Sequence, residues 1–278
     1  MSISQSVVQI INQSKIKPLI KWPGGKRALA ARILPFVSGV RGRYYEPFFG
    51  GGAIFFALKP KSAVISDANV ELINSYIQVR ENPERLIDIL KTFENSEDFY
   101  YKVRLSNPAG QLERAARLLY LTRLSFNGIH RVNLKGEFNV PYGKKTHLST
   151  VDELLVRSAS EALANTKIMT ADFQEATKDA EAGDVIYFDP PYTVAHANNG
   201  FVKYNERIFS WSDQMRLAAH AKELANRGCR VVVSNADHES VHKLYSGIEC
   251  HIIKRASVIA ASSTHRREIT ESLYLLGT

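Results

Sequence analysis

The segment Asp189-Pro190-Pro191-Tyr192 has the clearest capacity for chemistry in this sequence. It follows residues 185–188, an apolar run typical of a buried parallel strand, and the two prolines force the chain out of the sheet. The Asp189 carboxylate and the Pro190 carbonyl are thus stiffly placed hydrogen-bond acceptors beside the ring of Tyr192. Such a site could accept the amino group of a flat ring that stacks on the tyrosine. The alternative is an ordinary turn that ends a strand.

Two glycine turns earlier in the chain are candidates for a ligand site. The segment Lys21-Trp22-Pro23-Gly24-Gly25-Lys26 combines a flexible turn with a stacking ring and a cation, although it could also be a plain turn before a helix at 27–36. The segment Glu46-Pro47-Phe48-Phe49-Gly50-Gly51-Gly52 follows a short predicted strand and precedes a helix expected from about Ala53. This is the position at which a nucleotide-binding α/β domain has its first strand–turn–helix unit. The spacing of the glycines matches neither the dinucleotide-binding nor the P-loop motif.

Acidic residues end two further predicted strands. Asp67 follows the run 62–66 and lies fifteen residues after Gly52, close to the distance at which a carboxylate binds ribose hydroxyls. It could also cap the helix expected from Val70. Asp172 ends the strand predicted at 167–171. Ligands of open α/β sheets bind beyond the carboxyl ends of the strands, which is where these carboxylates fall.

The elements that position these motifs alternate as in an α/β sheet, with one interruption. Residues 70–106 and 111–125 have the apolar spacing of helices, so we expect a helical insert at 70–150. The segment 126–143 predicts a loop and a β-hairpin within this insert. The catalytic domain would then comprise residues 1–69 and 151–278, with residues 1–16 as an N-terminal extension.

The α/β pattern resumes after residue 150. We expect a long polar loop at 193–211, which is long enough to be mobile or functional. A helix is predicted at 212–227, with Ser212 as its N-cap and Gly228 at its C-terminal end. A buried strand is predicted at 230–235. The segments 250–254 and 272–276 are expected to form an antiparallel pair at the edge of the sheet.

The charge of the chain is uneven. The formal net charge is +8, and residues 114–145 hold seven basic side chains against one acidic side chain. Residues 151–230 hold nine basic and twelve acidic side chains. A local basic face in a mixed chain indicates a polyanionic partner, and a solvated basic face is the alternative. A basic hairpin tip has the size of an object that enters a major groove.

Composition excludes several classes of protein. The chain has two cysteines, Cys229 and Cys250, which lie beside apolar runs and suggest a reduced interior in place of a disulfide framework. No spacing typical of a zinc site is present, so we expect no metal. No uninterrupted apolar run approaches the length of a membrane span, and no secretory signal is visible. We expect a cytoplasmic protein that does not bind membranes.

With these motifs identified, the chain from Lys21 onward resembles the Dam-type DNA adenine-N6 methyltransferases. The resemblance rests on Lys21 to Lys26, Glu46 to Gly52, Asp67-Ala68-Asn69, residues 127–143, Asp189 to Tyr192 and Ser234-Asn235-Ala236-Asp237, in the order of the family. It implies a Rossmann-like S-adenosylmethionine-dependent methyltransferase sheet, with an inserted helical target-recognition domain that carries the hairpin. It also implies double-stranded DNA as the substrate. It implies no obligate protein partner, and we expect a monomer.

The resemblance carries roles over to individual residues. Those matching the catalytic motif are Asp189, Pro190, Pro191 and Tyr192. Those matching cofactor-contacting positions are Trp22, Lys26, Glu46, Phe48, Gly50, Asp67, Asp172 and Asp189. Those matching DNA-contacting positions are Lys21, Phe126, Asn127, Ile129, Arg131 and Pro141, with Asn133 beside them. The basic residues Lys144 and Lys145 are expected to contact phosphates.

The chain departs from the family pattern at a few positions. Phe126 stands where a tyrosine is common, and His130 stands where a small residue is often seen. Pro23 stands where a small residue is also common. No aromatic residue follows Lys144 and Lys145, which affects the expected phosphate contacts and processivity more than catalysis.

The resemblance implies methyl transfer to N6 of adenine after the base has left the duplex. Arg131 is suited to bind guanine O6 and N7, and Lys21 is a second candidate for a guanine contact. The apolar Ile129 and Pro141 are suited to a thymine methyl group. Together with the resemblance, these residues predict GATC as the target sequence. Arg131 could instead contact only phosphate.

Three other functions stay open from the sequence. A cytosine-N4 methyltransferase more often has Ser in place of Asp189, and an RNA or protein-glutamine methyltransferase more often has Asn there. A DNA-binding module without catalytic activity is the third alternative. The intact glycine turn and the set of acidic residues disfavour it, and binding of S-adenosylmethionine would discriminate.

Overall fold

The structure is a computed structural model that describes residues 18–194, 209–256 and 268–277. Its centre is a seven-stranded sheet with the order β3-β2-β1-β4-β5-β7-β6. The strands are β1 (Tyr44–Glu46), β2 (Ala63–Asp67), β3 (Thr166–Thr170), β4 (Val185–Phe188), β5 (Arg230–Ala236), β6 (Glu249–Ala256) and β7 (Glu268–Leu276). The first five strands are parallel, and β7 is antiparallel to both β5 and β6. The predicted α/β class is confirmed, as a mixed sheet.

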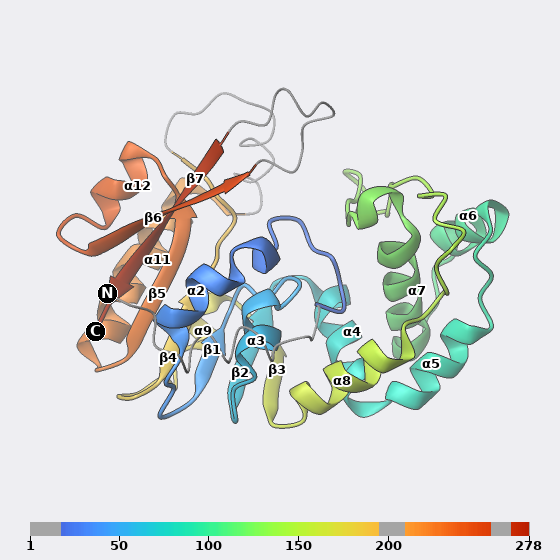
Figure 1. Ribbon diagram of the computed structural model, residues 1–278, viewed down its shortest axis with the longest axis horizontal. Coiled ribbons are helices and arrows are strands. Elements are labelled where there is room, and N and C mark those ends of the chain that lie inside the picture. Colours follow the sequence, from blue (N-terminus) through green and yellow to red (C-terminus); the bar gives the residue numbers. More distant parts are fainter. Residues whose placement is uncertain (1–17, 195–208, 257–267, 278) are drawn as a thin grey trace.

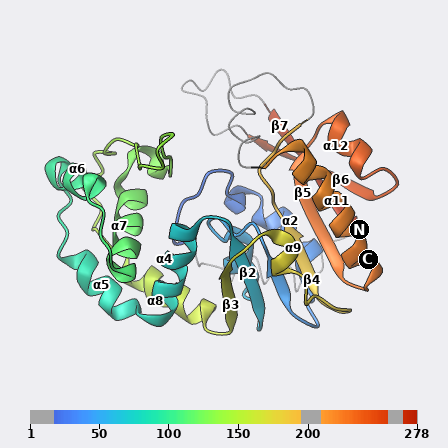
Figure 2. The same ribbon diagram turned by 180° about the vertical axis from the view of Figure 1, so that it is seen from behind.

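Helices cover both faces of this sheet (Figures 1 and 2). Side chains alternate along a strand, so Tyr187 of β4 packs with α2 (Ala30–Val37) and α3 (Ala53–Leu58) on one face. Its neighbour Phe188 belongs to the cluster on the opposite face. The helices of that face are α9 (Phe173–Ala176), α11 (Trp211–Asn226) and α12 (Glu239–Leu244). Because β4 is buried on both faces, its sequence is a continuous apolar run.

In the region of the predicted helical insert, the structure has a set of helices between β2 and β3 in the sequence. These are α4 (Val70–Glu81), α5 (Pro83–Lys91), α6 (Glu97–Leu105), α7 (Gln111–Leu124) and α8 (Glu153–Leu163). The stretch expected to be helical at 70–106 is therefore three helices. Pro83 begins α5 and Ser96 caps α6, so each break has a residue that favours it. Both views show α5, α6 and α7 beyond the β3 edge of the sheet (Figures 1 and 2).

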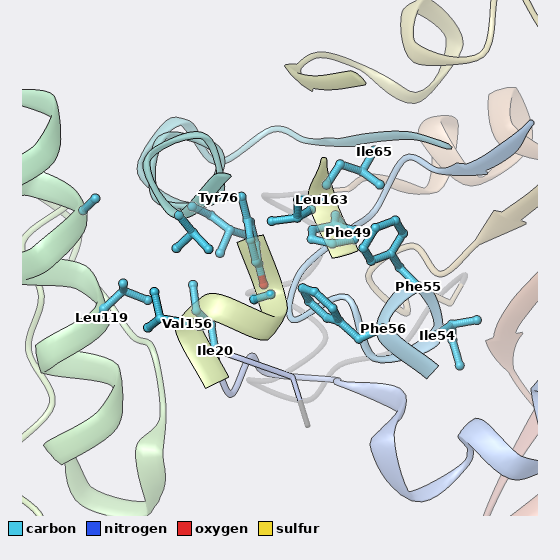
Figure 3. Packing of buried hydrophobic residues seen from close by; sticks show 14 of the residues in the cluster. Ile20, Phe49, Ile54, Phe55, Phe56, Ile65, Tyr76, Leu119, Val156 and Leu163 are labelled. Carbon is cyan, nitrogen blue, oxygen red and sulfur yellow. The ribbon is translucent and has the colours of Figure 1, made fainter. Parts of the chain in front are cut away.

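The insert shares its core with the sheet. Figure 3 shows Tyr76 of α4 beside Phe49, whose ring lies 4.7 Å away between centroids in an edge-on arrangement. The same cluster of buried residues contains Phe56 of α3 and Leu119 of α7. Tyr76 Oη also donates a hydrogen bond of 3.0 Å to the carbonyl of Gly50. The first helix of the insert thus supports the glycine turn after β1.

Several local predictions need correction. The segment 126–143 folds back on itself, but its described residues form only two isolated bridges, Ser125–Tyr142 and Val132–Phe138, and no regular strands. A left-handed Asn127 (φ 54°) and its turn interrupt the ladder. The N-cap of α11 is Ser210 and not Ser212, because Ser210 forms a reciprocal capping box with Asp213.

Three more interpretations are refined at the ends of the sheet and helices. β6 and β7 pair as predicted, but β7 also pairs with β5, so β6 is the one of these two strands that lies at an edge of the sheet. The helix expected at 27–36 is a short 3₁₀ turn, η1 (Lys26–Ala28), followed by α2. Cys229 is buried as expected, whereas Cys250 on the edge strand is exposed, and both are free thiols.

Two predicted segments lie largely or wholly outside the described residues. These are the N-terminal extension at 1–16 and most of the loop at 193–211. Within the described ranges, no helix is long and apolar enough to cross a lipid bilayer.

Candidate active site at the ends of β1 and β4

The site lies where the strand order of the sheet reverses. β1 and β4 are neighbours, and the chain leaves β1 towards β2 on one side and leaves β4 towards β5 on the other. In open α/β sheets, ligands bind in the crevice outside such a switch point. The glycine turn follows β1 here, and Asp189 to Tyr192 follow β4. The sheet therefore brings together two motifs that are far apart in the sequence.

A lysine from the first glycine turn joins this site. Lys26 is only 6% exposed, and its Nζ lies 2.8 Å from Asp189 Oδ1 and 3.5 Å from Glu271 Oε2. The same Nζ lies 4.6 Å from the centroid of the Tyr192 ring, which is a cation–π distance. Tyr192 Oη donates to Glu271 Oε2 at 2.8 Å and to Asp189 Oδ1 at 3.4 Å. Four side chains thus form one buried polar cluster.

Burial sets the charge state of this cluster. It raises the pKa of Asp189 to about 6, although the Lys26 ammonium acts in the opposite direction. Burial also raises the pKa of Tyr192 well above its ordinary value, so the phenol stays protonated and can donate. At neutral pH, Asp189 is therefore an ionised hydrogen-bond acceptor. Pro190 is buried directly beside it.

Glu271 is the member of this cluster that sequence reasoning missed. It lies on β7, is 4% exposed, and precedes Ser272 and the apolar run from Leu273 to Leu276. A carboxylate two residues before the apolar run of a predicted strand is the signal that could have identified it, since buried charges are almost always paired. Its contacts with Lys26 and Tyr192 depend on the pairing of β7 with β5, which joins distant parts of the chain.

We expect Glu271→Gln to shift the pH dependence of turnover. The Glu271 charge contributes to raising the pKa of Asp189, so its removal should lower that pKa below about 6. The acid limb of the profile of kcat/KM against pH should then move to lower pH. Measuring this profile between pH 5 and 8 tests the expectation, with Glu175→Gln on the surface of α9 as the control. An unmoved acid limb would show that Glu271 does not influence Asp189.

The glycine turn after β1 is held by Asp67. Its Oδ2 accepts a hydrogen bond of 2.9 Å from Gly50 N, and its Oδ1 accepts one of 2.9 Å from Asn69 N. The cap of α4 is the Asn69 side chain and not Asp67, so the alternative role considered for Asp67 is wrong. Gly50 has a φ of 48°, and a Cβ built there would meet Trp22 Cδ1 at 2.9 Å. Only glycine fits against this ring.

Glu46 at the end of β1 has an internal role in this structure. Its Oε2 accepts hydrogen bonds from Tyr44 Oη (2.8 Å) and from Phe55 N in the first turn of α3 (3.0 Å). Burial raises its pKa to about 8, with a smaller contribution from the Asp189 charge. Glu46 therefore fixes α3 relative to β1 and places the glycine turn.

Phe48 and Asp172 lie beside the cluster of buried residues on the α9 and α11 face of the sheet. Phe48 packs on Phe173 and Phe209 at centroid distances of 5.7 Å and 5.3 Å. Asp172 is adjacent to Phe173 in sequence, and its carboxylate is exposed. It caps α9 and forms two hydrogen bonds of 2.9 Å with Arg216. The half-buried Phe48 thus rests on two buried rings, and the Asp172 carboxylate next to them is paired with Arg216.

The loop at 126–145 carries most of the residues that are expected to contact DNA. Phe126 and Ile129 are exposed apolar side chains, at 54% and 38% of their full area, and Pro141 is exposed. Lys21 Nζ donates a hydrogen bond to the carbonyl of Asn127, which connects this loop to the first glycine turn. Lys21 is thus attached to the loop that carries the other residues expected to bind DNA.

The polar residues of this loop differ in what they contact. Arg131 is exposed, with its Nε 2.8 Å from Asn139 Oδ1. Asn133 forms the tip turn, since its Oδ1 accepts from the backbone of Lys135 and Glu137. Its side chain is therefore engaged within the protein.

The two lysines at the end of the loop also differ. Lys144 is exposed, with a φ of 52°. Lys145 is half-buried, and its Nζ donates to Arg123 O at 3.0 Å. Burial lowers the pKa of Lys145, and the nearby charges of Lys21 and Arg123 lower it further. This group of cations favours an anionic partner.

The fold and the site are consistent with an S-adenosylmethionine-dependent methyltransferase. The sequence comparison is more specific, because residues 22–259 match the family of D12 class N6 adenine-specific DNA methyltransferases, and the chain belongs to that family. The protein is an adenine-specific DNA methyltransferase, and the Dam-type resemblance is confirmed. Among the described residues, no group of three or more potential ligands could hold a metal ion.

Similar proteins come from bacteria and an archaeon. A Type II methyltransferase, M1.LlaDCHI, from Lactococcus lactis subsp. cremoris is 42% identical, over 94% of this chain and 95% of its own length. A Type II methyltransferase, M.MjaIII, from Methanocaldococcus jannaschii is 34% identical, over 91% and 96%. A DNA adenine methylase from Haemophilus influenzae is 32% identical, over 95% and 94%.

Proposed function

We propose that this methyltransferase transfers a methyl group from S-adenosylmethionine to N6 of adenine in GATC, after the adenine has been flipped out of double-stranded DNA. The observation that carries the proposal is the position of Asp189. Its side chain is only 16% exposed, and Pro190 beside it is buried. An adenine inside a duplex cannot bring its amino group to such a site, so base flipping is required.

The residues around the switch point fit the cofactor. The rings of Trp22 and Phe48 offer apolar surfaces for a nucleoside, and Asp67 keeps lone pairs for ribose hydroxyls beside its two backbone bonds. Lys26 is a cation that suits the carboxylate of an amino-acid tail. When bound, S-adenosylmethionine supplies a methyl group on a positively charged sulfur. The carboxylates of this site favour that positive charge.

Asp189 and Pro190 prepare the amino group of adenine for attack. The lone pair of this nitrogen is delocalised into the ring, so the nitrogen is a poor nucleophile. Hydrogen bonds from its two protons to the Asp189 carboxylate and the Pro190 carbonyl favour a more tetrahedral nitrogen with a localised lone pair. Orientation then provides most of the rate enhancement, and stacking on Tyr192 holds the ring. The amino proton is lost readily after methylation.

The loop at 126–145 is proposed to bind the DNA and to select the target. Phe126 and Asn127 would hold the duplex open where the base leaves, which the exposure of Phe126 supports, because an exposed apolar side chain can act as a wedge. Arg131 and Lys21 would each contact a guanine, and Ile129 and Pro141 would contact thymine methyl groups. Guanine contacts on both sides of an A·T centre support GATC. Action as a monomer in the cytoplasm stays a prediction.

Arg131→Ala is expected to relax the target sequence at one guanine. Arginine that binds guanine O6 and N7 contributes about 1–3 kcal/mol of discrimination against another base. The guanidinium is exposed, and its bonds to Asn139 use only part of its five donors. Sequencing of modified bases in DNA from cells expressing the variant measures the change.

Lys144→Ala is the matched control for this experiment. Its side chain is exposed on the same loop, so its loss should weaken binding to all sequences and flatten the salt dependence. If Arg131→Ala lowers activity uniformly and leaves the target unchanged, Arg131 contacts only phosphate. If the unaltered protein modifies adenines in a different DNA sequence, the GATC assignment is overturned.

A further inference from the structure

His130 connects the DNA-recognition loop to the first glycine turn. Its ring stacks on Trp22 with centroids 4.4 Å apart and an angle of 20° between the planes. Trp22 in turn packs on Gly50, where a Cβ would lie 2.9 Å from Trp22 Cδ1. The stack is thus continuous from the loop at 126–145 to the glycine turn after β1. No other role has been assigned to His130.

The His130 ring is held on a second side as well. Phe138 meets it in an edge-on arrangement at 5.6 Å between centroids. Burial lowers the pKa of His130 to about 4, with a further effect of the Arg117 charge. The imidazole is therefore neutral at physiological pH and acts as a flat aromatic surface. An aromatic stack of this kind does not depend on protonation between pH 6 and 8.

A second contact runs beside the stack. Lys21 precedes Trp22 in the chain, and its Nζ donates a hydrogen bond to the carbonyl of Asn127. Lys21 also lies over Gly128, since a Cβ on that glycine would be 3.1 Å from Lys21 Cδ. Two consecutive residues of the first glycine turn are therefore attached to the recognition loop.

We propose that His130 is a positioning residue that holds Trp22 in place for the cofactor from within the DNA-recognition loop. This inference rests on the proposed function, because it places the cofactor against Trp22. A small residue at position 130 could not form this stack on Trp22, so the connection requires an aromatic ring at that position. The state of the recognition loop then affects affinity for the cofactor even in the absence of DNA.

The experiment measures the affinity for S-adenosylmethionine by calorimetry without DNA. We expect the dissociation constant of His130→Ala to be roughly 2- to 10-fold larger, which corresponds to the loss of one aromatic pair. His130→Phe keeps a ring and should restore the affinity. His130→Leu repeats the test with an apolar side chain of similar size and should behave as His130→Ala does. His147→Ala, an exposed histidine of the same segment, is the control and should bind normally.

A double-mutant cycle separates positioning from a general structural effect. In a Trp22→Ala background, His130→Ala should cause no further loss of affinity, because the partner of the stack is absent. An additive further loss in that background would overturn the inference. So would unchanged affinity in His130→Ala, or a loss in His130→Phe equal to that in His130→Ala.

Failure of the proposed function gives a different result. If the unaltered protein did not bind S-adenosylmethionine, the proposed cofactor site and this inference would both be wrong. If the unaltered protein binds the cofactor and His130→Ala binds it equally well, the proposed function stands and only the role of His130 is refuted.

Discussion

Asp189→Ala is expected to reduce methyl transfer by about a hundredfold or more while the protein stays folded and still binds DNA. The carboxylate is the acceptor placed at the end of β4, and alanine leaves the amino group of adenine without that partner. Its removal also leaves Lys26 with Glu271 as a counter-ion at 3.5 Å, so the lysine stays paired. Incorporation of labelled methyl groups into DNA containing GATC measures the loss.

Asp189→Asn is the matched variant for this prediction. It keeps the size and one acceptor oxygen but lacks the charge, so it should retain more activity than Asp189→Ala. Circular dichroism and DNA binding confirm that both variants are folded. Turnover within a few fold of normal in folded Asp189→Ala would remove Asp189 from the catalytic assignment.

Lys26→Met should impair both cofactor binding and the charge state of Asp189. The ammonium lies 2.8 Å from Asp189 Oδ1 and opposes the rise of the pKa of that carboxyl group. Without it, the pKa of Asp189 should rise above about 6, since burial and the Glu271 charge both act upward. The acid limb of the profile of kcat/KM against pH should move to higher pH. A smaller fraction of the protein should then have Asp189 ionised and be active at pH 7.

This shift is opposite in sign to the one expected for Glu271→Gln, so the pair of variants tests the same cluster in two directions. Lys178→Met is the control, because Lys178 pairs with Glu175 on the surface, away from the strand ends. Calorimetry should show weaker binding of S-adenosylmethionine to Lys26→Met alone. A shift of the acid limb to lower pH, or no shift, would contradict the proposed ion pair.

The strands were predictable because burial on both faces leaves a simple pattern. β4 is a continuous apolar run that is followed by Asp189, and β5 has an apolar run at Val231–Val233 before Ser234 and Asn235. The position of Asp189 followed from the two prolines. Local chemistry of this kind is contained in a few neighbouring residues, so it can be recognised without knowledge of the fold.

Contacts between distant segments could not be predicted in the same way. Glu271 reaches Tyr192 only because β7 returns antiparallel beside β5. The stack of His130 on Trp22 depends on how the insert packs against the sheet. The role of Asp67 also needed the structure, because the sequence allowed it to cap α4, and the structure shows that the cap is the Asn69 side chain while Asp67 bonds to Gly50.

The backbone of the segment 126–143 differs from the predicted β-hairpin. Alternating apolar residues indicated a hairpin, yet Asn127 and Gly128 both have positive φ values. The Asn133 side chain then replaces ladder hydrogen bonds at the tip by bonding to Lys135 and Glu137. Side-chain-to-backbone bonds of this kind compete with strands, and a periodicity of two does not show them.

The shared core of the insert and the sheet limits how the enzyme could be re-engineered. A chimaera that exchanged residues 70–150 with those of a relative would replace Tyr76, which packs on Phe49 and bonds to Gly50. The graft would then alter the glycine turn after β1 together with the segment proposed to select the target sequence. A junction after Glu81, at the end of α4, keeps Tyr76 with its own glycine turn. A chimaera with a new target sequence is therefore expected to retain turnover only when it keeps α4 of the host enzyme.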